Sequence, residues 1–236
     1  MSKMIRLDKF LSDMSIGTRS EVKTILKRGR VAVNGVLQKN PDLKINSETD
    51  IVTVDGTDLK YQKFFYYILH KPTGVITATE DVNQETVMSL LGKDHRSDLF
   101  PVGRLDKDTE GLLLITNDGA LAHDLLSPKK HVPKTYLAEI PEKLTNAQIK
   151  ALEAGVDIGD EKPTLPATVK IIDDTHINLT IKEGRFHQVK RMLLAVDSQV
   201  LYLKRVSFGG LHLPKELEKG QYRALTEEEI SLLKCK

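Results

Sequence analysis

The most informative stretch of the chain reads GRLDKDTEGLLLITNDG and covers residues 103–119. Its second half, an apolar run at 112–115 followed by Asn117-Asp118-Gly119, predicts a short buried strand that ends in a turn. Its first half places Arg104 and Asp106 in the loop that enters this strand. Most loop charges are simply solvated, but a carboxylate on a loop anchored by a rigid strand is also a common place for a nucleophile or a base.

The same stretch resembles the catalytic motif of the pseudouridine synthases, in particular their ribosomal small-subunit branch. In that motif Arg-Leu-Asp precedes Thr-x-Gly-Leu-Leu, and this chain matches it with Arg104, Leu105, Asp106, Thr109 and Gly111. The resemblance implies that the protein isomerises uridine to pseudouridine in RNA with Asp106 as the catalytic carboxylate. It also implies that Arg104 occupies the space that the flipped uridine leaves in the RNA helix.

Two further motifs carry this resemblance. Lys134-Thr135-Tyr136 is similar to the second family motif, in which the tyrosine stacks on the target uracil, a task that suits an aromatic face. The run GRFHQVKRM at 184–192 is similar to the third motif, in which the residue at the position of Lys190 pairs with the catalytic aspartate. A nearby cation favours the ionised carboxylate that a nucleophile requires. Arg185 and Arg191 in this run are candidate RNA contacts.

The residues themselves leave several alternatives open. The nucleophile can add to C6 of the uracil or to C1′ of the ribose, and the sequence does not choose between these routes. A hydrolase that uses Asp106 together with Asp108 is a competitor, because residues i and i+2 of an extended loop share one face. The surrounding motif, however, matches no hydrolase pattern. Without the family motif, Tyr136 would be interpreted as a strand tyrosine that packs into the core. A strand that contains Leu203 and the Arg205-Val206 pair is expected to form an apolar wall of the pocket.

The N-terminal segment is basic and has the pattern of a small RNA-binding module. Residues 1–40 hold nine lysines and arginines against three acidic residues. Two amphipathic helices, at 7–14 and 18–28, precede a hairpin around Asn34-Gly35 and a further strand at 51–54. This arrangement resembles the S4 RNA-binding domain. The phosphate contacts that the resemblance implies come from Arg6, Lys9, Arg19, Lys23, Lys27, Arg28 and Arg30.

The tetrapeptide Arg-Leu-Asp-Lys occurs at 6–9 and again at 104–107. The first copy lies within an amphipathic helix and the second precedes a strand, so the two are not an internal repeat. We expect Asp8, in the first copy, to be a surface charge.

The rest of the chain predicts an α+β domain. Polar residues 57–63 are expected to link the S4-like RNA-binding domain, residues 1–60, to a pseudouridine synthase domain, residues 61–236. Helices are expected at 147–154, at 187–196 and at 226–236. Strands are expected at 65–69, 75–77, 112–115, 136–140, 167–172, 177–181 and 201–208. Strands with interposed helices indicate a mixed, mostly antiparallel sheet, as the family resemblance also implies.

Composition excludes several classes of protein. The single cysteine excludes internal disulfides and a cysteine metal cage, and the seven histidines show no ligand spacing, so we expect no metal. There is no phosphate-binding glycine loop or dinucleotide fingerprint, so we expect no cofactor. Charged residues from Lys3 onward and the lack of a long apolar run exclude a signal peptide and a membrane span, so we expect a cytoplasmic protein.

The sequence therefore predicts a two-domain, monomeric RNA pseudouridine synthase with Asp106, Tyr136 and Lys190 as its catalytic residues. Its length and the absence of a basic tail favour 16S ribosomal RNA, free or in a small-subunit assembly intermediate, as the substrate. A 23S ribosomal RNA target is the alternative within the family. The alternative outside the family's enzymes is a non-catalytic S4-type RNA-binding factor for ribosome assembly. Such a factor would have a disabled active site, whereas all three catalytic positions of this chain hold chemically competent residues.

Overall fold

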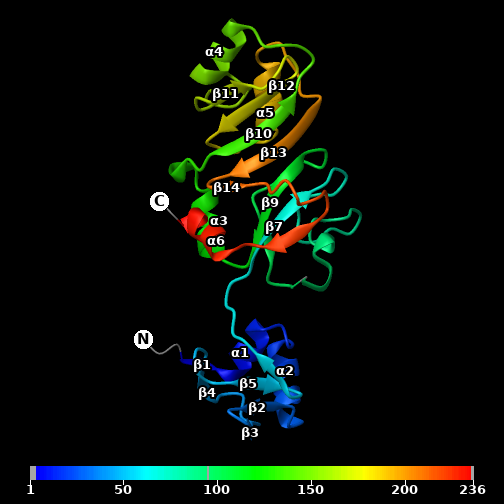
Figure 1. Ribbon diagram of the computed structural model, residues 1–236, viewed down its shortest axis with the longest axis vertical. Coiled ribbons are helices and arrows are strands. Elements are labelled where there is room, and N and C mark those ends of the chain that lie inside the picture. Colours follow the sequence, from blue (N-terminus) through cyan, green and yellow to red (C-terminus); the bar gives the residue numbers. More distant parts are fainter. Residues whose placement is uncertain (1–3, 95, 235–236) are drawn as a thin grey trace. The chain divides into compact units, whose positions relative to one another are not determined.

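The computed structural model describes residues 4–94 and 96–234. These form two compact units that meet between Phe64 and Phe65, each with a hydrophobic core of its own. Because the relative placement of the units is not determined, each is described by itself (Figure 1).

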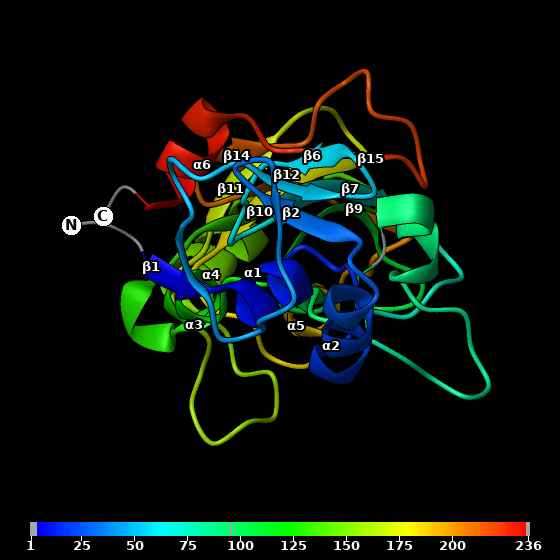
Figure 2. The ribbon, with the colours of Figure 1, turned by 90° about the horizontal axis from the view of Figure 1, so that it is seen from below.

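The first unit packs two short helices against small sheets (Figures 1 and 2). Its helices are α1 (Leu7–Asp13) and α2 (Arg19–Lys27). A four-stranded sheet has the order β3 (Val36–Leu37), β2 (Val31–Val33), β5 (Val52–Val54) and β6 (Thr57–Leu59), while β1 (Met4–Arg6) pairs with β4 (Lys44–Asn46). A capping box begins α2, because the Thr18 hydroxyl accepts a bond from the Glu21 amide and the Glu21 carboxylate accepts one from the Thr18 amide. The predicted helix–hairpin module is therefore present.

Two expectations for this unit are wrong. The segment 57–63 is not wholly a linker, because β6 takes up its first residues and pairs with β5. Asp8 is not a surface charge: it is 4% exposed, and its carboxylate accepts bonds of 3.0 and 2.7 Å from the guanidinium of Arg6. A buried carboxylate needs such a partner, and that partner lies two residues earlier in the chain.

The second unit is built on one large sheet. The strands on its main path are β11 (Thr168–Ile171), β12 (His176–Ile181), β10 (Lys134–Glu139), β13 (Tyr202–Phe208), β9 (Glu110–Thr116), β7 (Tyr66–Lys71) and β15 (Tyr222–Ala224), in this order. Two short strands pair off this path, β8 (Phe100–Val102) with β9 and β14 (Leu211–His212) with β13. Only the β13–β9 pairing is parallel among the described strands, so the prediction of a mixed, mostly antiparallel sheet is confirmed.

The second unit also contains helices. They are α3 (Gly119–Leu126), α4 (Asn146–Ala154), α5 (Gln188–Leu194) and α6 (Glu227–Lys234), with 3₁₀ turns at Ser89–Asp94 and Pro128–Lys130. The predicted turn at 117–119 is instead the start of α3, because the Asp118 side chain accepts a bond from the Leu121 amide and caps the helix. The predicted strand at 75–77 is reduced to an isolated bridge between Ile76 and Thr86. Residues 235–236 of the expected C-terminal helix lie outside the described residues.

Gly111 allows β13 to lie directly against β9. Its φ is +109°, and a Cβ built there would lie 2.2 Å from the backbone oxygen of Arg205. Only glycine permits this approach. The parallel pairing of Gly111 with Arg205 therefore brings β13 to the point where the loop of Asp106 enters β9.

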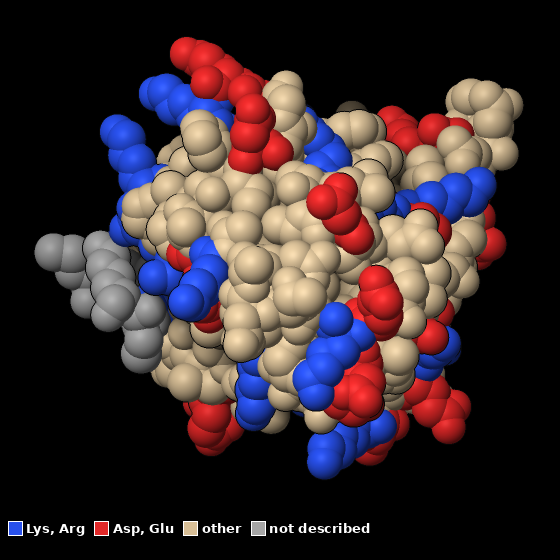
Figure 3. Space-filling model, turned by 90° about the horizontal axis from the view of Figure 1, so that it is seen from above, with Lys and Arg blue, Asp and Glu red and all other residues tan. Residues whose placement is uncertain are grey.

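Charge on the outer surface of this unit is mixed. Basic and acidic side chains alternate around a largely uncharged centre on the face that Figure 3 shows. In the part of the chain that the structure describes, no helix combines the length and the apolar character needed to cross a bilayer.

Candidate active site

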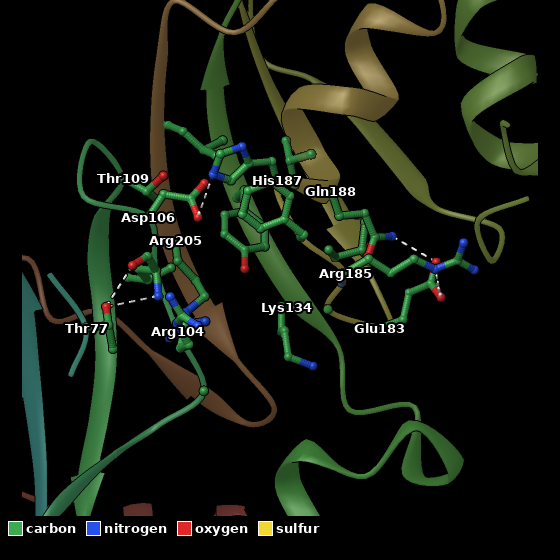
Figure 4. Close-up of a pocket in the computed structure, with 18 of the residues that line it drawn as sticks. Thr77, Arg104, Asp106, Thr109, Lys134, Glu183, Arg185, His187, Gln188 and Arg205 are labelled. Atoms are coloured by element: carbon green, nitrogen blue, oxygen red, sulfur yellow. Dashed lines mark hydrogen bonds and ion pairs between the residues drawn. The ribbon is translucent and has the colours of Figure 1, made fainter. Parts of the chain in front are cut away.

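The three predicted catalytic residues line one cavity. Its volume is about 680 Å³, and its walls include Asp106 from the loop before β9, Tyr136 from β10 and Lys190 from α5. These residues come from three separate motifs, and the order β10–β13–β9 of the sheet brings their elements together. Figure 4 shows the Asp106 and His187 side chains turned toward one another at one end of this cavity.

The loop that carries Asp106 is held by a buried threonine. The Thr77 hydroxyl donates a bond of 2.7 Å to the backbone oxygen of Leu105 and accepts one of 3.1 Å from its amide (Figure 4). A further bond of 3.1 Å joins the Thr109 amide to the backbone oxygen of Asp106. The backbone on both sides of the carboxylate is thus restrained.

A buried lysine holds the same loop from the other side. Lys71 is 0% exposed, and its ammonium donates bonds of about 3 Å to the backbone oxygens of Pro72, Asp106 and Thr109. Burial lowers the pKa of Lys71 to about 8. Lys71 was not among the predicted site residues, although a lysine at the end of an apolar strand and directly before Pro72 is an unusual local pattern.

Thr77 provides a test of this restraint. Thr77→Val keeps the shape of the side chain but leaves the buried amide and carbonyl of Leu105 without their partner, which costs about 1–3 kcal/mol in stability. Because a shift of the catalytic group by about 1 Å can slow a reaction about 100-fold, we expect Thr77→Val to lower kcat by roughly 10- to 100-fold. Thr77→Ser retains the hydroxyl and is the matched control. Equal rates for the two variants, measured in a single-turnover assay with folding checked by thermal melting, would contradict a positioning role for this hydroxyl.

Two basic side chains approach the Asp106 carboxylate. The Lys190 ammonium lies 3.4 Å from Oδ2, and Nε2 of His187 lies 3.5 Å from Oδ1. Lys190 is closer to Asp108, at 2.7 and 2.8 Å, and this bond holds the pKa of the Asp108 carboxyl below its usual range. Lys190 therefore bridges two carboxylates, where the family resemblance implied a pair with Asp106 alone.

Backbone geometry places His187 beside Asp106. Its φ of +49° lies in the left-handed region, directly before α5 begins. Its ring stacks on that of Phe186, with ring centroids 3.8 Å apart. The sequence placed His187 within the third motif but did not assign it a contact with the carboxylate.

Tyr136 and Arg104 differ in their exposure. Tyr136 is 8% exposed, and its hydroxyl has no hydrogen-bond partner among the described residues. Arg104 lines the cavity with an exposed side chain. Both residues line the cavity.

Arg185 and Arg191 have intramolecular partners. Arg185 bonds to the Glu183 carboxylate and to the backbone oxygens of Lys162 and Pro163. Arg191 bonds to the backbone oxygen of Ile158 and to the Asp160 carboxylate. Both guanidinium groups hold the segment 158–163, and Arg185 also lines the cavity, so their contacts with RNA stay a prediction.

The wall of the cavity on β13 is not wholly apolar. Leu203 lies there as expected, but Arg205 also lines the cavity and is 1% exposed. The burial of Arg205 could not be predicted from the local sequence, because its hydrogen-bond partner, the backbone oxygen of Leu112, lies on another strand.

Comparisons with known proteins agree with the predicted family. The model of the family described as RNA pseudouridylate synthase matches residues 65–195, and the S4 domain model matches residues 5–52. A crystal structure of a pseudouridylate synthase is similar with a TM-score of 0.69 at 36% identity, covering 97% of this chain and 99% of that chain.

Curated relatives match over nearly their full length. An uncharacterized RNA pseudouridine synthase, YtzG, of Bacillus subtilis is 48% identical over 97% of this chain and 98% of its own. Ribosomal small subunit pseudouridine synthase A of Pasteurella multocida is 40% identical over 96% and 98% of the two chains. The Escherichia coli protein of the same name is 39% identical over 96% and 99%.

Proposed function

The chain belongs to the RNA pseudouridylate synthase family, and we propose that it isomerises a specific uridine of 16S ribosomal RNA to pseudouridine with Asp106 as the nucleophile. Its membership makes it an RNA pseudouridine synthase with an S4 domain. What we propose beyond this membership is the ribosomal RNA target and the roles of individual residues. We place the reaction in the cytoplasm, on free ribosomal RNA or on a small-subunit assembly intermediate, and expect the enzyme to act as a monomer.

The observation that carries the proposal is the position of Asp106. Its carboxylate lines the large cavity, its backbone is restrained on both sides, and the Lys190 ammonium and the His187 imidazole lie within 4 Å. Positive charge beside a carboxylate favours the ionised, nucleophilic form. The second acid of the loop, Asp108, is 71% exposed at its side chain and does not line the large cavity. This disfavours a hydrolase that pairs Asp106 with Asp108.

The reaction needs four events at the target nucleotide. The C1′–N1 bond breaks, the uracil turns, and a C1′–C5 bond forms, after which C5 loses its proton. Asp106 supplies the nucleophile, at C1′ or at C6. Tyr136 offers a ring on which the extruded base can stack, and Arg104 is placed to occupy the space that this base leaves in the RNA.

Mapping pseudouridines in ribosomal RNA tests the proposal. Cells that lack the gene should lose one pseudouridine from 16S ribosomal RNA, and the wild-type gene should restore it while an Asp106→Asn gene does not. Loss from 23S ribosomal RNA instead would establish the alternative target. A complete set of pseudouridines in the deleted strain would favour the non-catalytic assembly factor.

The S4 domain presents one basic helix face. Arg19, Lys23 and Lys27 are exposed and recur every four residues along α2, so they share one side of this helix. The other predicted contacts in this domain differ: Arg6, Lys9 and Arg30 are paired with Asp8 and Asp42, with Asp13 and with Asp55. We therefore propose the α2 face, with Arg28 at its end, as the phosphate-binding surface of the S4 domain.

Neutralising this face should weaken RNA binding and its salt dependence. Each lost phosphate contact lowers the slope of log K against log salt by about 0.7–0.9, so replacing Arg19, Lys23 and Lys27 by glutamine should reduce the slope by about 2–3. The matched control replaces the exposed Lys39, Lys44 and Lys60 of the same domain. Binding isotherms at several salt concentrations measure the effect. An equal change of this slope in both triple variants would show that the α2 face is not the specific phosphate-binding surface.

A further inference from the structure

Two buried cations line the active-site cavity, and neither is paired with an acidic side chain of the described residues. Lys134 is 8% exposed and Arg205 is 1% exposed, and both contribute to the cavity wall. No carboxylate of the described residues lies within 4 Å of either charge. Buried charges are normally paired, because removal from water without a counter-charge is strongly unfavourable. The arrangement therefore calls for a ligand.

The two side chains share one face of neighbouring strands. Arg205 of β13 lies directly opposite Tyr136 of β10, and Lys134 lies two residues before that tyrosine. Cross-strand partners have adjacent side chains, so the guanidinium lies beside the ring on which we propose the uracil stacks. Both cations also lie over the ring of Phe208, at 5.2 Å for Lys134 and 5.1 Å for Arg205, which orients them.

Each cation has unused hydrogen-bonding capacity. Arg205 donates from Nε to the backbone oxygen of Leu112 at 2.8 Å, whereas its Nη2 is buried without a partner among the described residues. Lys134 donates a single bond, of 2.9 Å, to the backbone oxygen of Val132. Burial, together with the charge of Arg205, lowers the pKa of Lys134 to about 8. In Figure 4 Lys134 lies at the end of the cavity away from Asp106.

We propose that Lys134 and Arg205 bind the carbonyl edge of the flipped uracil and stabilise the negative charge that the base carries during the isomerisation. This inference rests on the proposed function. The ribose and phosphates of the target nucleotide remain joined to the RNA strand, so the base is the part that reaches the buried inner wall. Its two carbonyl oxygens are acceptors, which match the free donors of both side chains.

Both routes of attack produce this charge. If Asp106 adds at C1′, the electron pair of the C1′–N1 bond stays on the base, and the uracil anion carries it on its ring nitrogen and carbonyl oxygens. If Asp106 adds at C6, the pair of the C5–C6 double bond moves onto the O4 carbonyl as an enolate. On the C1′ route, C5 of the turned base uses this pair to displace the Asp106 carboxylate from C1′, and C5 then releases its proton while N1 takes one up. On the C6 route, the C1′–N1 bond breaks next, C5 bonds to C1′, N1 takes up a proton, and loss of the C5 proton expels the Asp106 carboxylate from C6. Fixed cations in a water-excluded wall favour the charged state over the neutral base.

The same contacts select uracil. Cytosine carries an amino group in place of O4. This amino group is a hydrogen-bond donor, so it cannot accept a bond from Lys134 or Arg205. The cationic wall therefore excludes cytosine at the target position in addition to stabilising the anion.

Lys134 variants test the proposal in a single-turnover assay. Loss of one donor to a developing anion slows the chemical step about 100- to 1000-fold, so we expect this loss for Lys134→Gln with nearly unchanged affinity for ribosomal RNA. Lys134→Arg keeps the charge and should recover most of the rate. Lys170→Gln, at an exposed lysine of β11, is the matched control for the loss of one charge.

Binding of small probes separates a base site from a phosphate site and needs no turnover. 5-Nitrouracil is an anion at neutral pH, so the wild-type protein should bind it more tightly than uracil, and Lys134→Gln should lose this preference. Binding of inorganic phosphate that Lys134→Gln abolishes, without any preference for 5-nitrouracil, would overturn the base site in favour of a phosphate site. A wild-type protein that makes no pseudouridine contradicts the proposed function. An active wild type with equally active Lys134→Gln contradicts this inference alone.

Discussion

Asp106→Asn should abolish pseudouridine formation while leaving ribosomal RNA affinity nearly intact. An amide matches the carboxylate in shape but is a far weaker nucleophile, and loss of a nucleophile slows catalysis by about 10⁴-fold or more. Stability should change little, because this side chain makes an ion pair of 3.4 Å with Lys190 and a contact of 3.5 Å with the His187 imidazole at a partly exposed site.

The matched control for this variant lies two residues away. Asp108→Asn makes the same chemical change in the same loop, at a side chain that is 71% exposed. We expect it to keep activity within about tenfold of wild type, because it removes a bond to Lys190 and not the nucleophile. Pseudouridine formation by Asp106→Asn at a similar level, measured in a single-turnover assay, would contradict the assignment of the nucleophile. Loss of activity in both variants would support a mechanism that uses the carboxylates of both Asp106 and Asp108.

The parts of this site that the sequence predicted are those that lie within continuous motifs. Asp106 and the strand that follows it form one uninterrupted run, and Lys190 belongs to another run 84 positions later. The fold brings the two runs to one cavity, where the Lys190 ammonium lies 3.4 Å from Oδ2 of Asp106. Family resemblance supplied the expectation that Asp106, Tyr136 and Lys190 meet, and no local pattern contains that information.

The parts that the sequence did not predict depend on burial of charge. Lys71 and Arg205 are fully buried, and each bonds to backbone oxygens supplied by other segments of the chain. Periodicity assigns lysine and arginine to the surface, because an unpaired buried charge is rare. Asp8 illustrates the same failure, since its burial depends on the guanidinium of Arg6.

Some short sequence patterns are compatible with two local structures. Asn117-Asp118-Gly119 after a strand is typical of a turn, and a side chain that can cap a helix gives the same signal. The apolar residues of 121–125 that pack behind this cap identify it as the start of α3. Arg185 and Arg191 similarly look like free surface charges until the segment 158–163 lies against them.

Tyr136 can act as a stacking platform or as a base, and two substitutions separate these roles. Stacking needs only the ring, whereas removal of the C5 proton needs the hydroxyl. Tyr136→Phe should therefore bind target RNA normally but lose about 100-fold or more in rate, the range of general-base catalysis. Tyr136→Ala should in addition weaken RNA binding by about 1–3 kcal/mol, the contribution of one stacked base.

The structure makes Tyr136→Phe an unusually clean change. Because the hydroxyl has no partner among the described residues, its removal breaks no intramolecular bond, and thermal stability should match wild type. Release of tritium from RNA labelled at C5 of uridine measures the proton transfer directly, and a binding isotherm measures stacking. A wild-type rate of tritium release by Tyr136→Phe would restrict this residue to stacking. The base would then be sought at His187, which lies 3.5 Å from Asp106, or in water.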